Sequence, residues 1–241
     1  MTYDRNDHRP AHSGGPAGNG PARQKQRHSN NQLRGNRSRS PLPLRKRKPP
    51  KEERKIYFIA LLPTAEVGKE IIRLKQEFAE NYESRRALKV LPHITLQTPF
   101  TTSATVEREL CQGLTDFAAS MSPFEIRLDG FGGVLLNHRK VLYINVCKTE
   151  GITRLHQEMV SFLRKNFGFS PMLARHGFNP HISLAFRDLT EDEFAEALSE
   201  YSRKEYEASF RVRNLYLLRH TGTSWEVLQK CPLGVSGRVG V

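Results

Sequence analysis

The sequence predicts an α+β fold of two lobes related by a pseudo-twofold axis, with two β-sheets lining a central cleft and helices on the outside. Three observations predict it. Hydrophobic patterns typical of strands and of amphipathic helices alternate along residues 56–231. The order strand, helix, strand, helix, strand occurs twice, the second time from near Val141. Each repeat carries the same short motif in its second strand, PHITL at Pro92–Leu96 and PHISL at Pro180–Leu184.

The first repeat begins with an almost wholly apolar run that is typical of a buried strand, residues 56–63. A helix capped by Thr64 and ending near Tyr82 follows, because apolar residues recur there every three or four positions. Its charged residues, Lys75 among them, are expected to lie mostly off that apolar face. The remaining elements of this repeat are predicted as a strand at 92–100, a helix at 103–119 and a strand at 124–134.

The second repeat begins with a strand at 141–146 and a helix at 151–167. The strand that starts at His181 comes next. Thr190 and Glu193 form a predicted capping box for a helix that ends near Ser202. Two closing strands are predicted, at 208–220 and 224–231.

Basic residues concentrate at the N-terminus. Residues 1–55 contain 15 Lys and Arg against 4 Asp and Glu, whereas the rest of the chain contains 23 against 21. Large apolar residues are scarce in this part of the sequence, so it cannot bury enough surface to offset the entropy lost on folding. We predict a disordered basic tail over residues 1–54 and a folded domain over residues 55–241. The tail is expected either to contact nucleic-acid phosphates or to act as a solvated spacer.

Composition and hydropathy argue against a membrane protein or a secreted, disulfide-bonded protein. No apolar run is long enough for a membrane helix and no secretory leader is recognisable, so we expect a cytoplasmic protein with no membrane partner, and a monomer. Three widely spaced cysteines predict reduced thiols rather than disulfides.

The two motifs carry the chemistry. Residues i and i+2 of a strand share one face, so His93 lies beside Thr95, and His181 beside Ser183. Facing each other across a cleft, the two pairs would surround a space that fits a phosphate. One imidazole could remove a proton while the other donates one, and the hydroxyls could hold phosphate oxygens. We therefore predict acid–base phosphoester chemistry without a cofactor, and no metal site because a third ligand is missing near either motif.

The sequence HITL at 93–96 and HISL at 181–184 resembles the paired His-x-Thr/Ser-x motifs of the 2H phosphoesterase superfamily. Within it, residues 56–231 are similar to the bacterial 2'-5' RNA ligase-like proteins. The resemblance implies a bilobal fold with a central cleft and a metal-independent phosphodiesterase that acts on 2',3'-cyclic phosphate RNA ends or related nucleotides, with reverse 2'-5' ligation as an associated activity. It implies that His93, Thr95, His181 and Ser183 are the catalytic residues.

Other residues near the motifs are candidates for substrate contact. Gln97 is expected on the face of His93 and Thr95 by the period of two. Phe100 and Phe186 follow the two motifs, either as base-stacking surfaces or as core residues. The candidate phosphate contacts are Arg175, His176 and Arg187.

Two further interpretations stay open. A protein that binds RNA ends without turnover, aided by the basic tail, also predicts RNA binding, but only an enzyme predicts hydrolysis that survives EDTA. A structural or adaptor protein leaves the repeated His-hydroxyl pairs without an explanation.

Overall fold

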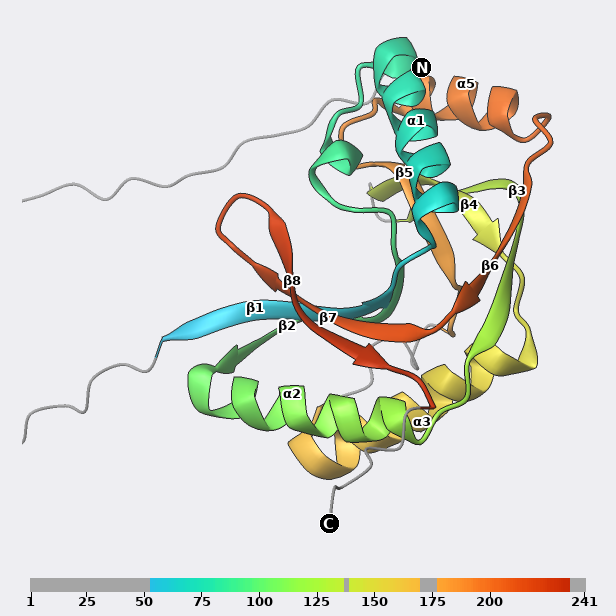
Figure 1. Ribbon diagram of the computed structural model, residues 1–241. Coiled ribbons are helices and arrows are strands. Elements are labelled where there is room, and N and C mark those ends of the chain that lie inside the picture. Colours follow the sequence, from blue (N-terminus) through green and yellow to red (C-terminus); the bar gives the residue numbers. More distant parts are fainter. Residues whose placement is uncertain (1–52, 137–138, 170–176, 235–241) are drawn as a thin grey trace, which may run out of the picture. The chain divides into compact units, whose positions relative to one another are not determined.

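The computed structural model describes residues 53–136, 139–169 and 177–234, with Figure 1 showing their arrangement. Within them lie eight strands and four α-helices. The strands are β1 (Arg54–Leu61), β2 (Ile94–Ser103), β3 (Phe124–Leu136), β4 (Arg139–Val146), β5 (His181–Phe186), β6 (Glu207–Val212), β7 (Asn214–His220) and β8 (Trp225–Pro232). The helices are α1 (Ala65–Tyr82), α2 (Ala104–Ala119), α3 (Glu150–Phe167) and α5 (Glu191–Tyr201), with a short 3-10 helix η1 (Arg86–Lys89) before β2.

The strands form two antiparallel sheets with matching orders. The first sheet runs β2-β1-β7-β8 and the second runs β5-β4-β3-β6. In each sheet the strand that carries a His motif lies at one edge and pairs with the strand that precedes it in its repeat, β2 with β1 and β5 with β4. The predicted bilobal α+β architecture with pseudo-twofold symmetry is confirmed.

The helices cover the outer faces of the two sheets. Figure 1 shows α2 beside the first sheet with α3 next to it, and α1 and α5 beside the second sheet; α3 contacts both α2 and β3. Helix α1 follows β1 of the first sheet yet contacts β5 and β6 of the second. A helix of one repeat therefore packs on the sheet of the other, which brings the residues of α1 close to the second His motif.

The helix ends agree with the sequence pattern. Thr190 accepts a hydrogen bond from the backbone of Glu193, and the Glu193 carboxylate accepts from the backbone of Thr190. The predicted capping box is therefore present at the start of α5. Thr64 and Ser103 occupy the N-cap positions of α1 and α2 without a side-chain cap bond.

One predicted strand is wrong. The run 208–220 is two strands, β6 and β7, which belong to different sheets. The residues of this run that belong to the main core are Phe210 and Val212 and then Leu215 and Leu217, so the alternation shifts by one at Arg213 and the chain changes sheet there. Strand β1 begins at Arg54, one residue inside the predicted tail.

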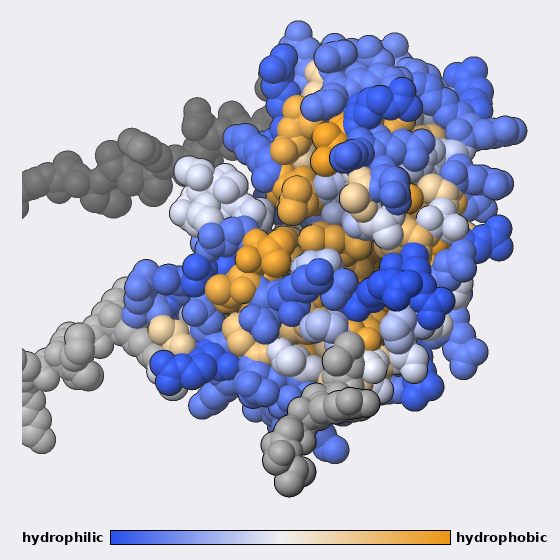
Figure 2. Space-filling view, viewed as in Figure 1, coloured by the Kyte–Doolittle hydropathy of each residue, from blue (hydrophilic) through white to orange (hydrophobic). Residues whose placement is uncertain are grey.

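The surface is mostly hydrophilic over the helices. Figure 2 shows hydrophobic surface gathered in the middle of the viewed face, over β7 and β8 and below α1. None of the helices in the described part of the chain is long and apolar enough to cross a membrane. The cysteines Cys111, Cys147 and Cys231 are free thiols.

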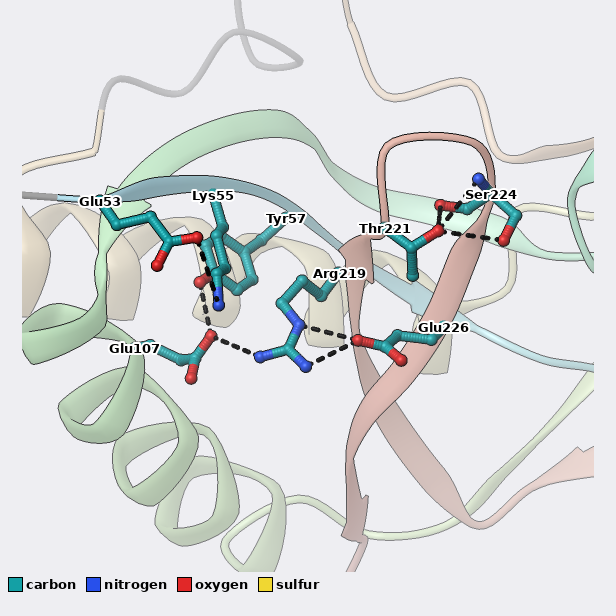
Figure 3. A network of polar contacts seen from close by, with 8 residues as sticks. All are labelled: Glu53, Lys55, Tyr57, Glu107, Arg219, Thr221, Ser224 and Glu226. Carbon is teal, nitrogen blue, oxygen red and sulfur yellow. Dashed lines mark hydrogen bonds and ion pairs between the residues drawn. The ribbon is translucent and has the colours of Figure 1, made fainter.

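A polar network fixes α2 to the first sheet (Figure 3). Glu107 of α2 accepts a hydrogen bond from the Tyr57 hydroxyl of β1 and pairs with Arg219 of β7 at 3.2 Å. Arg219 also pairs with Glu226 of β8 at 2.7 Å. Burial and the Glu107 carboxylate raise the pKa of Tyr57, so this hydroxyl stays a donor. Because Tyr57 and Glu226 are next in sequence to Phe58 and Trp225, the network holds two strands that line the pocket described below.

Candidate active site

The two motifs occupy equivalent edges of the two sheets. His93 comes directly before β2, and His181 is the first residue of β5. The apolar residues of each motif are fully buried and anchor the strand edge; they are Ile94, Leu96, Ile182 and Leu184. Burial of such a side chain typically contributes about 1.5–3 kcal/mol to stability. The packing of these four residues therefore fixes the backbone from which each imidazole extends.

Both imidazoles are oriented by the same backbone contact. Nδ1 of His93 lies 2.7 Å from the carbonyl oxygen of Leu91, and Nδ1 of His181 lies 2.8 Å from that of Asn179. A carbonyl oxygen only accepts hydrogen bonds, so Nδ1 carries the proton and donates it in each ring. This tautomer leaves Nε2 of each imidazole as the nitrogen that can accept or deliver a proton.

One pocket of about 420 Å³ contains both motifs. Its lining residues are Phe58, Lys75, Val90, His93, Thr95, Pro99, Val141, His181, Ser183, Phe186, Arg187 and Trp225. The structure therefore brings the two imidazoles and the two motif hydroxyls to a single space. That volume is within the range of small-ligand sites.

The pocket changes the acidity of both imidazoles. Burial lowers the pKa of His93 to about 4; the positive charge of Lys75, and that of His181 when it is protonated, act in the same direction, and the Leu91 carbonyl opposes them. Burial also lowers the pKa of His181, opposed by the Asn179 carbonyl. Both rings are therefore neutral at pH 7 in the free protein. An anionic phosphate in the pocket would raise both pKa values again.

A β-bulge follows each motif and decides which later residues face the pocket. In β2 the register moves from Ala60 opposite Thr95 to Ile59 opposite Gln97, so two residues of β2 match one of β1. Gln97 therefore lies on the core side beside Ile59 and is only 5% exposed. The expectation that Gln97 shares the face of His93 and Thr95 is wrong for this reason.

The two phenylalanines have different places. Phe186 lines the pocket, because the bulge between Ser183 and Ala185 turns it to that side. Phe100 packs against the core, with its ring 5.9 Å from that of Tyr57 and 4.7 Å from that of Phe169. Phe100 is therefore a core residue, and Phe186 is the one of the two that lines the pocket.

The remaining candidates are distributed as follows. Arg175 and His176 lie outside the described residues. Arg187 lines the pocket, has a left-handed backbone with φ of 70°, and donates its backbone N–H to the carbonyl oxygen of Lys140 at 3.1 Å. A non-glycine residue held in this conformation marks a constrained position, here directly after β5, the strand that carries the second motif.

Sequence reasoning missed several residues that line the pocket, above all Phe58, Lys75 and Trp225. Phe58 lines the pocket because β1 alternates: Phe58 and Ala60 lie on one side of the strand, and Tyr57, Ile59 and Leu61 lie in the main core on the other. Lys75 is 3% exposed and lies between Ile71 and Phe78 on the buried side of α1, so the expectation that it lies off the apolar face is wrong. Lys75 lies four residues after Ile71, so both lie on the same face of the helix, and this spacing was the sequence signal for its burial.

Trp225 stands at the start of β8. Its ring lies 4.5 Å from Phe58 in an edge-to-face contact and 4.9 Å from His220. No motif in the sequence indicates that this hairpin reaches the pocket. Within the described ranges, no group of three or more His, Cys, Asp and Glu residues is arranged to hold a metal ion.

Comparison with known proteins identifies the family. The family described as the 2'-5' RNA ligase superfamily matches residues 63–224, which span both motifs. The chain belongs to this superfamily.

Individual relatives agree with that assignment. A protein of Bacillus mycoides strain KBAB4, provisionally named a phosphoesterase, is 31% identical over 157 residues, which cover 64% of this chain and 86% of that protein. Among solved structures, apo LigT of E. coli has a TM-score of 0.55 at 20% identity and covers 76% of this chain and 99% of its own. TT0787 of Thermus thermophilus has a TM-score of 0.52 at 19% identity, covering 74% and 98%. These two structures share the fold.

Proposed function

We propose that this protein is a metal-independent phosphodiesterase that opens 2',3'-cyclic phosphates at RNA ends or on related nucleotides. The observation that carries the proposal is the shared orientation of His93 and His181, each with Nδ1 fixed by a backbone carbonyl and each lining the same pocket. Membership of the 2'-5' RNA ligase superfamily supports a phosphodiester substrate.

The reaction needs one proton removed and one delivered. Nε2 of one imidazole takes a proton from water as the water oxygen forms a bond to phosphorus. The bond between phosphorus and one ribose oxygen breaks, and Nε2–H of the other imidazole, now protonated, delivers its proton to that oxygen. Thr95 and Ser183 donate to the non-bridging oxygens, where negative charge accumulates. A 5'-hydroxyl in place of water would give a 2'-5' linkage by the same proton transfers.

The other walls of the pocket suit a nucleoside. Phe58, Trp225 and Phe186 supply aromatic surface near the motifs, and Arg187 supplies a cation at its edge. Aromatic side chains stack on unpaired bases in many RNA-binding sites. A crystal structure of E. coli LigT, which shares the fold, is a complex with 3'-AMP.

The test is a panel of 2',3'-cyclic nucleotides, RNA oligomers with 2',3'-cyclic phosphate ends and 2',5'-linked oligomers, assayed with and without EDTA and with identification of the products. We expect turnover that is unchanged by EDTA. Tight binding of cyclic-phosphate ends with no product would favour the non-catalytic RNA-end-binding protein instead. Loss of turnover in EDTA would contradict the two-imidazole mechanism.

A further inference from the structure

Four aromatic rings in contact run from the imidazole of the first motif to the hairpin between β7 and β8. The ring centroids are 4.9 Å apart for His93 and Phe58, 4.5 Å for Phe58 and Trp225, and 4.9 Å for Trp225 and His220. The first three rings line the pocket that contains both motifs, whereas its described lining residues do not include His220. The row of rings therefore continues past the wall of the pocket.

The far end of this row lies on the side of the first sheet opposite α2. Cross-strand partners share a side, so His220 lies with Trp225, and the adjacent Arg219 points the other way and pairs with a carboxylate of α2. Val227, on the side of Trp225, is 41% exposed. Figure 2 shows hydrophobic surface over β7 and β8. This side of the hairpin is therefore accessible to a ligand that extends from the pocket.

The hairpin turn holds His220 in one orientation. The backbone N–H of Gly222 donates to Nδ1 of the ring at 3.1 Å. Nδ1 is thus the acceptor, so Nε2 is the nitrogen that carries the ring proton. Gly222 has a φ of 102°, a backbone conformation that residues with a side chain rarely adopt. His220 therefore presents a half-buried ring with a fixed N–H donor, which suits stacking on a base and a hydrogen bond to a nucleotide oxygen.

A basic part of the chain begins beside His220. The start of β1 and the hairpin line one hollow of about 410 Å³, which contains His220 and Arg54. Its carboxylates, Glu53 and Glu226, each pair with a neighbouring cation, whereas Arg54 has no carboxylate partner within the described ranges. Residues 1–55 carry 15 Lys and Arg against 4 Asp and Glu. The charge at this end of β1 therefore favours a polyanion.

We propose that Trp225, His220 and Arg54 form a subsite for the nucleotide that precedes the one bearing the terminal phosphate, so that the preferred substrate is an RNA end of two or more nucleotides rather than a free cyclic nucleotide. The inference rests on the proposed function, which places the terminal phosphate between His93 and His181. A pocket of about 420 Å³ is of the size that encloses one small ligand, so the preceding nucleotide lies outside it. There the rings stack on its base, and Nε2–H of His220 and the guanidinium of Arg54 donate to phosphodiester oxygens.

The dependence of RNA binding on length tests the subsite. The ligands are 3'-UMP and uridylates of two and four nucleotides that end in a 3'-phosphate. Binding is measured by calorimetry and by the fluorescence of Trp225, the single tryptophan of the chain. The full-length proteins are the wild type, His220→Ala, His220→Phe and Thr223→Ala. Phe keeps a ring for stacking, and Thr223, exposed on the same hairpin, provides the control.

In the wild type the second nucleotide should tighten binding by about 5- to 150-fold, the range for one base stacked on an aromatic side chain. His220→Ala should lose most of this gain, whereas His220→Phe and Thr223→Ala should keep most of it. Equal affinities for one and two nucleotides in the wild type, or a full gain in His220→Ala, would overturn the inference. The wild-type comparison needs no variant, so it decides even if His220→Ala does not fold.

The charge is tested at Arg54. Arg54→Gln should weaken binding of the four-nucleotide ligand and reduce the slope of log affinity against log salt by about one. Arg164→Gln, exposed on α3, is the control, and an unchanged slope in Arg54→Gln would contradict the phosphate contact. Fluorescence of Trp225 that changes with protein concentration in the absence of RNA would show that a second copy of the chain covers this side, and would overturn the subsite.

Binding and turnover separate this inference from the proposed function. Length-dependent binding without opening of any 2',3'-cyclic phosphate would contradict the proposed function and support the subsite. Equal kcat/KM for 2',3'-cyclic UMP and for the uridine dinucleotide with the same cyclic end would contradict the subsite and support the proposed function.

Discussion

Asp188 accepts a hydrogen bond from the hydroxyl of Ser84 at 2.6 Å, across 104 positions of sequence. Its other carboxylate oxygen accepts from the backbone N–H of Arg86 at 2.8 Å. Asp188 comes just after the second motif, and Ser84 and Arg86 belong to the segment that leads to the first. One carboxylate therefore connects the turn before His93 to the end of the strand that carries His181.

Asp188→Asn should weaken that connection. An amide keeps one acceptor oxygen but directs N–H donors at a partner that is itself a donor, so we expect unfolding free energy to fall by about 1–2 kcal/mol. We also expect kcat to fall, because the turn that holds His93 is less well fixed. Chemical denaturation and steady-state kinetics measure the two effects. Asp129→Asn, exposed on β3, is the control; an Asp188→Asn protein that matches it in both would contradict this role.

The pH dependence of kcat/KM follows from the depressed pKa values. The base must be neutral and the acid protonated, so activity falls below the pKa of one imidazole and above that of the other. His93 has a pKa of about 4, and the pKa of His181 lies below its usual value of 6.5. We predict a bell-shaped profile with its optimum in the acidic range between these limits. An optimum above pH 7 for kcat/KM would contradict the prediction.

The lowered pKa of His93 also affects the free energy of unfolding. The folded protein binds a proton at His93 less readily than the unfolded chain, so this residue favours unfolding as pH falls from 6.5 to about 4. The unfolding free energy of His93→Gln should therefore decrease less over this interval than that of the wild type. Parallel denaturation curves at pH 4.5 and 7 measure the difference, and identical pH dependences would show that the His93 pKa is not depressed.

Gly132 supports the second imidazole through Tyr143. A Cβ at this position would lie 2.8 Å from the Tyr143 ring and 2.9 Å from Oδ1 of Asn145, while Tyr143 lies against His181. Gly132→Ala should displace Tyr143 and lower kcat. Gly68→Ala is the matched control, because its Cβ would meet Pro63 at an ordinary 3.7 Å. A Gly132→Ala enzyme with wild-type kcat would show that Tyr143 does not orient His181.

The basic N-terminal sequence is predicted to strengthen RNA binding. Deletion of residues 1–48 leaves β1 complete and removes most of the excess positive charge. If these residues contact phosphates, affinity for RNA falls and its dependence on salt becomes shallower. Titrations at several salt concentrations measure both. An unchanged slope would identify the segment as a spacer.

The sequence predicted the elements and the motif pair because both depend on local pattern. Capping at Thr190 and the alternation of buried and exposed residues around His93 and His181 are properties of a few neighbouring residues. The position of Gln97 could not be predicted, because a bulge is set by pairing with β1 and reverses the face of the strand. Trp225 and Lys75 reach the pocket through tertiary packing, and only the spacing of Lys75 from Ile71 hinted at its burial.

The central claim is that His93 and His181 act on one phosphorus atom, and the single and double Asn variants test it most directly. Measured as kcat on a 2',3'-cyclic nucleotide, each single variant should lose on the order of 10² to 10⁴. The double variant should be little worse than the poorer single one, because residues that act as a unit are not additive. A single variant that keeps most of its kcat, or a double variant whose loss is the full product of the two, would contradict the account.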